Sequence, residues 1–569
     1  MLKDTVVPLE GDGQSVHDVV YSRRRREVPR MVRELDALKF GRSSEDEYTR
    51  SDKIYQRMRI LERLLKYFVG RNGPPVQIMQ FVNWDATITI NNVFYVVPKS
   101  VSEIRSVLVA ANAIGLRVRA TGAGHTRSPL YPDEGHIMMD MRSVKRHDGK
   151  QIEIHPKTTV RNFQTVTVMS GVYQYELNDF LLKNRVTMLS QPINYNETVG
   201  GMVAASTHGS TWDAPTWSGF VVEMRLLDSR GRLRRFTKED HPELMKALMC
   251  NLGMMGVMYD ITIQVYPAIK VDVRQHFDTV GNLFYNNTKL RDLITGNFLV
   301  EMSWYPFSSV TDDEAESFQR TGDVPTSWTV KNDEVWYRTF TVNDTIPEVN
   351  LRGPMFLPTG GSISGSNVTG ILRGRNAIKI PKSLPAHTQH WLVDAFQVIM
   401  PPKRGSETSA AFLLNVDNDF IRPSEAFKFM AERVETQIKT RATSPFNAIL
   451  PRFFENSDCF LCFGNTNIQL PNDSNHSLVI DFLAPPTQDG FYQTAEAFVN
   501  RFKDEKVRPH WAKRHTDIPG IVDILRSTYG ENLDNFHQQK ILSNVDPCDM
   551  FMNDYLLTIF GRQRSRWLC

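Results

Sequence analysis

The chain has 569 residues and a formal net charge of +3, with 41% hydrophobic and 23% charged residues. This length predicts two or more domains, and the composition is that of a globular protein. Because the charge is close to zero, we exclude a nucleic-acid-binding protein and expect no nucleic-acid partner.

Residues 1–75 are interpreted as a helical and basic extension. The run YSRRRREVPRMVR (21–33) predicts a solvated or disordered basic arm, with contact to an acidic partner or an anionic membrane surface as the alternative. In SDKIYQRMRILERLLKYFVG (51–70), apolar residues recur at helical spacing, which predicts an amphipathic helix packed on the body.

The sequence also bears on location. It shows no apolar run long enough to span a bilayer, and its first residues lack the pattern of a secretory signal. It has five cysteines, an odd and sparse number that fits a reducing compartment. We therefore expect an intracellular protein, cytoplasmic or membrane-associated. The segment CFLC (459–462) is predicted to be buried strand rather than a metal or redox site.

Short strands and helices alternate from residue 76 to residue 268, which predicts an α+β domain. Segment 100–115 has a serine cap and a glycine stop, as helices do. Segments 92–100 and 116–124 are predicted strands. Segment 158–172, TTVRNFQTVTVMSGV, has a helical pattern despite several β-branched residues.

Three turns of small residues punctuate this α+β domain. The first, Gly122-Ala123-Gly124-His125, fails as a Rossmann dinucleotide fingerprint because Arg127 occupies the third glycine position. Successive backbone N–H groups in such a turn can instead bind phosphate. Taken singly, each turn is explained by tight packing alone. Together they favour an extended ligand such as a flavin dinucleotide. The other two turns are Gly200-Gly201 and Thr207-His208-Gly209.

Beyond residue 268 the pattern changes. The apolar segments FLVEMSWYPF (298–307) and AAFLLNV (410–416) predict strands of an antiparallel sheet with flanking helices. Between them lies a long Gly/Ser-rich loop, LPTGGSISGSNVTG (357–370).

Several of these segments resemble one family. The resemblance is carried by VPKSVSEIRSVLVAANAIGLRVRATGAGHTRSP, TVGGMVAASTHGSTW, LGMMGVMYDITIQVYP, RPHWAK and DPCDMFMNDYLLTIFG. They resemble the vanillyl-alcohol-oxidase superfamily, whose FAD-binding domain is called PCMH-type, and within it the aldonolactone oxidoreductase branch. The resemblance covers roughly residues 76–560. It implies a two-part PCMH-type FAD-binding domain over 76–268, then a substrate-binding cap domain over 269–569 whose C-terminal tail returns to the active site.

The resemblance implies FAD as the cofactor, no metal, and a covalent bond from His125 to the flavin. The alternative for His125 is a hydrogen bond to FAD, and for His208 a structural role in its turn. The implied FAD-contacting residues are Gly122, Ala123, Gly124, His125, Thr126, Ser128, Gly200, Gly201, Thr207, His208, Gly209, Gly256 and Val257.

On the substrate side the resemblance implies catalytic roles for His510, Lys513 and Arg452. Relatives carry a Glu-x-Arg pair facing the flavin, but here Leu450 stands at the glutamate position. Asp394 or Glu455 could supply a carboxylate from elsewhere. The implied activity is oxidation of a sugar 1,4-lactone, with oxygen or another acceptor reoxidising the flavin. The alternatives are oxidation of a different polyol or alcohol, and a catalytically weakened flavin-binding protein.

Overall fold

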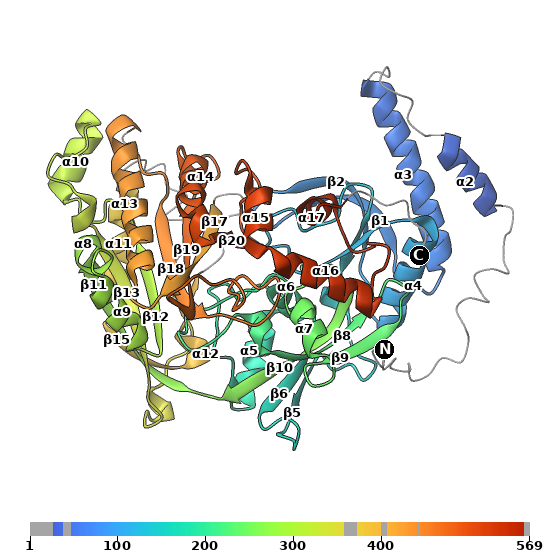
Figure 1. The fold of residues 1–569 in the computed structure, drawn as a ribbon, viewed down its shortest axis with the longest axis horizontal. Coiled ribbons are helices and arrows are strands. Elements are labelled where there is room, and N and C mark those ends of the chain that lie inside the picture. Colours follow the sequence, from blue (N-terminus) through green and yellow to red (C-terminus); the bar gives the residue numbers. More distant parts are fainter. Residues whose placement is uncertain (1–26, 38–46, 358–371, 400–406, 442, 563–569) are drawn as a thin grey trace.

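The structure is a computed structural model that describes residues 27–37, 47–357, 372–399, 407–441 and 443–562. Two sheets built from the N-terminal half lie beside one large sheet built from the C-terminal half (Figure 1). Most of the Gly/Ser-rich loop, residues 358–370, and the first part of the basic run, residues 21–26, lie outside the described residues.

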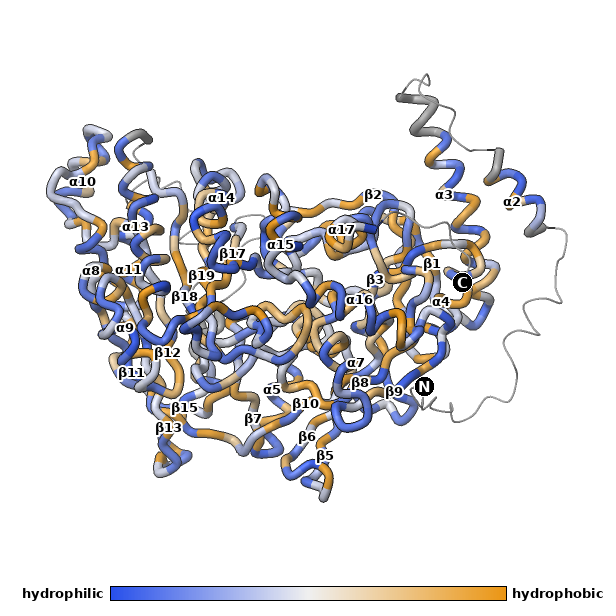
Figure 2. The backbone as a smooth tube through the Cα atoms, viewed as in Figure 1, coloured by the Kyte–Doolittle hydropathy of each residue, from blue (hydrophilic) through white to orange (hydrophobic). Residues whose placement is uncertain are grey.

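Two helices precede the first sheet, α2 (Glu27–Ala37) and α3 (Glu47–Val69). Helix α3 buries Leu61, Leu64 and Leu65 and packs on α4 (Val101–Ile114). In Figure 2 apolar and polar residues alternate along α3. The predicted amphipathic packing helix is therefore confirmed. None of the helices in the described ranges combines the length and the apolar character needed to cross a membrane.

The first sheet has four strands in the order β1-β2-β4-β3. Strand β4 pairs in parallel with both β2 and β3. Helix α4 covers this sheet and has the predicted caps: Ser100 accepts from the N–H of Glu103 at 3.3 Å, and Gly115 ends the helix at φ 69°. Strand β3 runs directly into the first glycine-rich turn. The strands are β1 (Val76–Val82), β2 (Thr89–Val96), β3 (Val118–Thr121) and β4 (Ile137–Asp140).

The second sheet is antiparallel, in the order β5-β6-β10-β8-β9, and β7 (Val186–Thr187) also pairs with β10. The helix predicted over 158–172 is wrong, because this segment contains strand β6 (Gln164–Met169), paired on both sides. Its run of β-branched residues suits a pleated strand better than a helix. The other elements are β5 (Ile152–His155), β8 (Val221–Leu227), β9 (Leu233–Thr237), β10 (Val257–Pro267), α5 (Gln174–Lys183), α6 (Val199–Ala204) and α7 (Pro242–Leu248).

The third sheet has eight antiparallel strands in the order β15-β11-β13-β12-β18-β19-β17-β20. Helices α9 (Asn287–Thr295), α11 (Leu372–Lys382) and α13 (Ile421–Arg441) contact its strands, so the predicted antiparallel sheet with flanking helices is confirmed. The strands are β11 (Lys270–Thr279), β12 (Leu299–Trp304), β13 (Glu334–Val342), β15 (His387–Trp391), β17 (Thr408–Asp417), β18 (Ala448–Glu455), β19 (Asp473–Ala484) and β20 (Arg508–Pro509).

Smaller elements surround this sheet. They are β14 (Met355–Leu357), β16 (Gln397–Ile399), α8 (Val280–Leu283), α9 (Asn287–Thr295), α10 (Asp312–Thr321), α11 (Leu372–Lys382), α12 (Leu392–Ala395), α13 (Ile421–Arg441) and α14 (Phe491–Phe502).

The C-terminal helices α15 (Ile521–Tyr529), α16 (Glu531–Ser543) and α17 (Asp554–Ile559) return to the N-terminal half, beside α7 and β2 (Figure 1). The N–H of Val118 donates to the carbonyl of Met550 at 2.9 Å, and the buried Arg119 donates to that of Phe551 at 2.7 Å. Asn553 donates to the carbonyl of Pro129 at 2.6 Å. The tail therefore braces strand β3 and the loop that follows the first glycine-rich turn.

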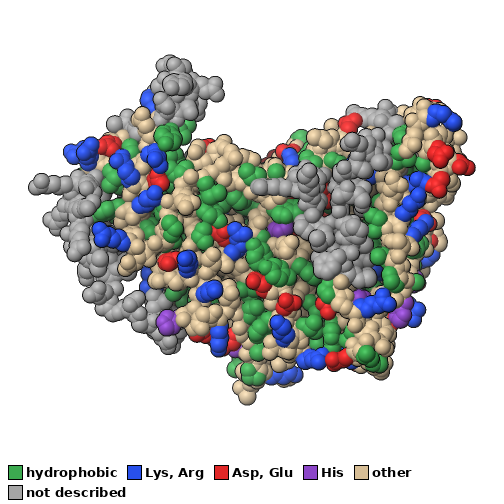
Figure 3. Space-filling model, turned by 180° about the vertical axis from the view of Figure 1, so that it is seen from behind, with side chains coloured by type: hydrophobic (Ala, Val, Ile, Leu, Met, Phe, Trp, Pro, Cys, Tyr) green, Lys and Arg blue, Asp and Glu red, His purple; other side chains and the backbone are tan. Residues whose placement is uncertain are grey.

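The segment 459–462 is buried but forms a turn, so the predicted strand is wrong. The carbonyl of Leu461 accepts from the indole of Trp511 at 2.8 Å rather than from a neighbouring strand, and Cys459 and Cys462 are joined in a disulfide. On the face shown in Figure 3, acidic and basic side chains are interspersed, as the small net charge indicates.

Candidate active site

One cavity joins the N-terminal sheets to the eight-stranded sheet. Its wall is formed by the turn after β3, by residues around α6, and by side chains of β18, β19 and the segment after β20. The cavity brings together most of the residues predicted from the sequence: Gly122, Ala123, Gly124, His125, Thr126, Gly200, Gly201, Thr207, His208, Gly256, Arg452, His510 and Lys513.

Three predicted residues do not line this cavity. Ser128 is buried, and its hydroxyl donates to the carbonyl of Trp511. Gly209 packs against Gln191 and Ser190, where an added Cβ would lie 2.8 Å from the Gln191 nitrogen. Val257 begins strand β10 and faces the core, paired with Leu227. Ser128, Gly209 and Val257 therefore support the segments that line the cavity without lining it themselves.

The glycine-rich turn meets a structural test for binding a phosphate group. In the described part of the chain, the N–H groups of residues 122–126 donate no backbone or side-chain hydrogen bond. Gly124 has φ +76°, which favours glycine because a Cβ is strained there. Unpaired successive N–H groups form a concave site for an anion. The turn therefore fits the pyrophosphate of FAD.

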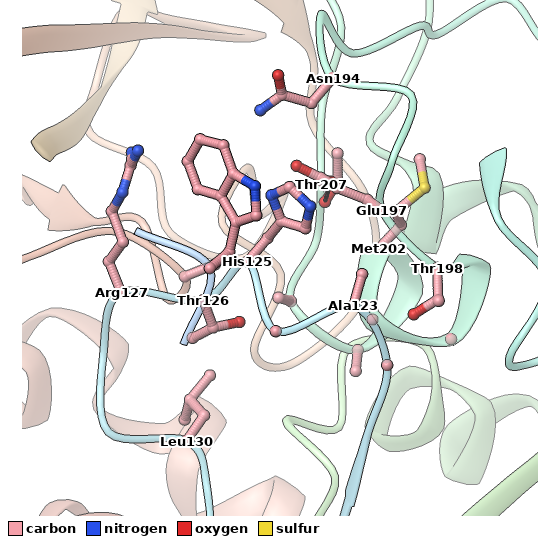
Figure 4. Close-up of a pocket in the computed structure, with 18 of the residues that line it drawn as sticks. Ala123, His125, Thr126, Arg127, Leu130, Asn194, Glu197, Thr198, Met202 and Thr207 are labelled. Carbon is pink, nitrogen blue, oxygen red and sulfur yellow. Dashed lines mark hydrogen bonds between the residues drawn. The ribbon is translucent and has the colours of Figure 1, made fainter. Parts of the chain in front are cut away.

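His125 projects from this turn into the space that Glu197 and Thr207 also face (Figure 4). Its ring stacks on Trp84, with centroids 4.9 Å apart and planes 19° apart. Burial, reinforced by the positive charge of Arg127, lowers the pKa of His125 to about 4. The imidazole is consequently neutral at physiological pH, which is its nucleophilic form.

His510 directly follows strand β20 and also lines the cavity, and its ring centroid is 5.5 Å from that of His208. Burial and the neighbouring rings and cations hold the pKa of His510 well below its ordinary value, so the ring is neutral. Its Nδ1 accepts the N–H of Ala512 at 3.0 Å. The proton of the neutral ring is therefore on Nε2, which acts as a hydrogen-bond donor.

His208 stacks on Phe454, with ring centroids 4.8 Å apart, and its Nδ1 lies 3.1 Å from the carbonyl of Gly209. Burial and the charge of Arg452 lower the pKa of His208 to about 3. This histidine is therefore a neutral ring that packs the floor of the cavity while lining it.

Strand β18 carries Leu450 and Arg452 into the cavity. Proline lacks the N–H that a central strand uses in its ladder, yet β18, which contains Pro451, is intact. The ladder between β12 and β18 has a single register pair, Trp304 with Ile449, which ends two residues before Pro451. A residue that lacks an N–H is tolerated beyond the end of that ladder.

The structure adds three carboxylates that sequence reasoning missed, Glu197, Glu407 and Asp481, all of which line the cavity. Burial raises the pKa of Glu407 to about 7 and also raises that of Glu197. Neither Asp394 nor Glu455, the two acids considered from the sequence, lines it. The available signal for Asp481 was an isolated acid within the apolar run SLVIDFLA.

The fold and this cavity define the class, an FAD-binding protein of PCMH-type architecture. A family model described as "FAD binding domain" matches residues 93–237, and one described as "D-arabinono-1,4-lactone oxidase" matches residues 415–559. The chain thus carries an FAD-binding domain and a domain similar to those of D-arabinono-1,4-lactone oxidases. The resemblance to the aldonolactone branch is confirmed.

Individual relatives agree with these matches. D-arabinono-1,4-lactone oxidase of Eremothecium gossypii is 26% identical over 40% of this chain and 41% of its own length. L-gulonolactone oxidase of Scyliorhinus torazame is 20% identical over 84% of this chain and 98% of its own length. The chain thus spans about two fifths of the first of these relatives.

The fold is similar to that of cholesterol oxidase from B. sterolicum. That similarity has a TM-score of 0.69 at 16% identity and covers 86% of this chain and 99% of the oxidase chain. At this level of identity it supports the architecture alone.

Proposed function

We propose that the protein is an FAD-dependent oxidoreductase that oxidises a CH–OH group of a sugar 1,4-lactone. One observation carries the proposal: His510 and Lys513 lie in the same cavity as the glycine-rich turn at 122–126. The phosphate-binding turn and the groups suited to alcohol oxidation therefore face one space. Relatives named as lactone oxidases support this substrate class.

Bound FAD would supply the hydride acceptor. Lys513 brings a positive charge into the cavity, which stabilises the negative charge that builds up as a hydride is accepted. The Nε2–H of His510 donates a hydrogen bond to an oxygen of the substrate, and Arg452 offers further donors to lactone or hydroxyl oxygens. These side chains orient the substrate and exclude water from the reacting carbon.

We also propose that His125 holds FAD through a covalent bond, because the ring is neutral, lies beside the turn at 122–126 and is oriented by stacking on Trp84. The new C–N bond would replace a C–H bond of the cofactor's methyl group and the N–H bond of the imidazole, and the two protons and two electrons released would pass to solvent and to oxygen or another acceptor. A hydrogen bond to FAD without covalent attachment is the alternative. Oxygen or another acceptor would then take the electrons from the reduced cofactor.

A second candidate function is oxidation of another polyol or alcohol. It is favoured by Leu450, which lines the cavity where relatives carry a glutamate. A catalytically weakened flavin-binding protein is the third candidate, and the retained His510 and Lys513 argue against it.

Anaerobic stopped-flow mixing tests these candidates. The enzyme is mixed with L-gulono-, L-galactono- and D-arabinono-1,4-lactone, and with alditols such as xylitol, while flavin absorbance is followed. Bleaching by a lactone supports the proposal, and bleaching by alditols alone supports the second candidate. If dithionite bleaches the flavin but no lactone or polyol does, both are overturned and the third candidate stands.

A further inference from the structure

The substrate side of the cavity lacks a polar side chain at the position of Leu450. Leu450 and Arg452 are two residues apart on β18 and both line the cavity, as residues on one face of a strand do. Arg452 stands at the arginine position of the Glu-x-Arg pair that the family resemblance implies, while Leu450, at the implied glutamate position, offers only a hydrocarbon side chain. A hydroxyl placed there finds no acceptor on β18.

A carboxylate lies directly opposite this gap. In the ladder between β18 and β19, Leu450 is the register partner of Asp481. Register partners in an antiparallel pair share one face of the sheet, with Cβ atoms about 5 Å apart. Both side chains line the cavity, whereas Ile480 and Phe482, on either side of Asp481, are in the apolar core. The register thus aims Asp481 at the space that Leu450 leaves apolar.

Within the described part of the chain, only one of the two carboxylate oxygens of Asp481 has a partner. Its Oδ2 lies 3.1 Å from Nζ of Lys513, and its side chain is only 13% exposed. Its Oδ1 is buried and has no hydrogen-bond partner among the described residues. Because a buried carboxylate oxygen without a donor is costly, the arrangement is suited to a donor that arrives with a ligand.

The other two carboxylates of the cavity are less suited to this role. Glu197 stands beside α6, near the glycine-rich turns, where its Oε2 already lies 3.5 Å from the hydroxyl of Thr207. Glu407 directly precedes β17, and burial raises its pKa to about 7. At neutral pH it is therefore partly protonated, and only part of the population carries a carboxylate that can accept a hydrogen bond. Asp481 alone of the three is paired with Lys513 at hydrogen-bonding distance.

We propose that Asp481 is the substrate-positioning carboxylate of this enzyme, taking from the neighbouring strand the role that Leu450 cannot fill. Its Oδ1 accepts a hydrogen bond from a hydroxyl of a polyhydroxylated lactone or alditol, while Oδ2 keeps Lys513 in place. Since Asp481 adjoins Lys513, the hydroxyl it accepts lies on the Lys513 side of the cavity. This inference rests on the proposed oxidation of a polyhydroxylated substrate.

The test compares Asp481→Asn, which keeps the shape and removes the anion, with the double variant Leu450→Glu/Asp481→Ala, which returns a carboxylate to β18. Asp292→Asn, an exposed acid on α9, is the matched control. The first readout is calorimetric binding of the best lactone or alditol to dithionite-reduced enzyme, which cannot turn it over. The second is the separation of kcat from KM for flavin reduction.

We expect Asp481→Asn to weaken binding and raise KM about 10- to 100-fold, the usual effect of losing a hydrogen bond to a charged group. The double variant should recover part of this loss, and Asp292→Asn should change nothing. Among monodeoxy analogues of the substrate, the one lacking the hydroxyl that Asp481 accepts should bind wild type and Asp481→Asn equally, a result that a merely structural role would not produce.

The outcomes distinguish failure of the inference on Asp481 from failure of the proposed function on which it rests. If wild type and Asp481→Asn bind and oxidise the same substrate alike, the inference on Asp481 is overturned and the proposed function stands. If the variant weakens binding of the full substrate and of every monodeoxy analogue equally, Asp481 acts only through the structure and the inference is again overturned. If no lactone or alditol reduces the wild-type flavin, both are overturned together.

Discussion

The Cα of Gly122 lies against the side chain of Thr198, so closely that a methyl group on Gly122 would overlap Thr198 Oγ1. Gly122 follows strand β3, and Thr198 directly precedes α6. This contact therefore holds the turn at 122–126 against the start of α6, and the predicted turn at Gly200-Gly201 is wrong because both glycines lie within that helix. Gly122 is needed here for packing against the segment before α6 as much as for approach to a ligand.

We predict that Gly122→Ala displaces the turn at 122–126 and lowers FAD occupancy several-fold. The purified variant is assayed by its flavin-to-protein absorbance ratio. Gly353→Ala is the control, because an added Cβ there meets nothing within 4 Å. Adding Thr198→Ala should restore part of the occupancy by removing Oγ1. Full occupancy in Gly122→Ala would show that the turn adapts and would contradict this reading.

We predict that flavin stays with the wild-type chain after denaturation and that His125→Ala abolishes this. The reason is that His125 is neutral, is stacked on Trp84 and projects into the cavity from the turn. The measurement is in-gel flavin fluorescence after SDS electrophoresis. His241→Ala serves as a control, since His241 caps α7 and does not line the cavity. Release of free flavin from wild type would show a noncovalent cofactor.

The hydrogen bond from the N–H of Ala512 to Nδ1 of His510 predicts different outcomes for two substitutions. His510→Gln can place an N–H near the position of Nε2, whereas His510→Asn can replace only the acceptor at Nδ1. We expect His510→Asn to slow flavin reduction about 100-fold, the effect of removing one aimed donor. His510→Gln should be impaired less. Stopped-flow reduction at saturating substrate measures both.

If His510→Asn instead retains more activity than His510→Gln, the donor role of Nε2 is wrong. Flavin content and thermal melting should match wild type in both variants, which keeps a folding defect from being read as a catalytic one.

Asp333 predicts a pH dependence of stability. Burial raises its pKa to about 6, although it accepts from the N–H of Phe307 at 2.8 Å and the indole of Trp328 at 3.0 Å. At a pH between the pKa values of Asp333 in the unfolded and folded states, Asp333 is protonated in the folded state and ionised in the unfolded state. Its contribution to stability is therefore largest at low pH and falls as the pH rises towards 6.

The measurement is the apparent free energy of unfolding in urea at pH 4.5 and 7.5, for wild type and Asp333→Asn. Relative to the variant, wild type should lose about 2 kcal/mol between these pH values, because one pKa unit corresponds to about 1.4 kcal/mol. The comparison cancels the other titrating groups. Parallel pH profiles for the two proteins would show that Asp333 titrates normally.

The sequence by itself determined the local parts of this protein. Ser100 and Gly115 mark the ends of α4, and the apolar spacing of α3 predicts the face it buries. The small-residue turn after β3 was also readable, because steric requirements of tight backbone act over a few residues, whereas Gly200 and Gly201 lie within helix α6 rather than in a turn. Segment 158–172 was misread because its apolar spacing suited a helix, while pairing with β5 and β10 decided for a strand.

Only the tertiary structure decided which of these residues face the cavity. Ser128 comes three residues after His125 of the predicted turn, yet its hydroxyl donates to the carbonyl of Trp511, 383 residues away. Asp481 is 31 residues from Leu450 in the sequence but stands opposite it in the ladder, beside Lys513 from a third segment. Strand register and the folding back of distant segments set these neighbours, and both depend on burial of the whole apolar core rather than on local residue preference.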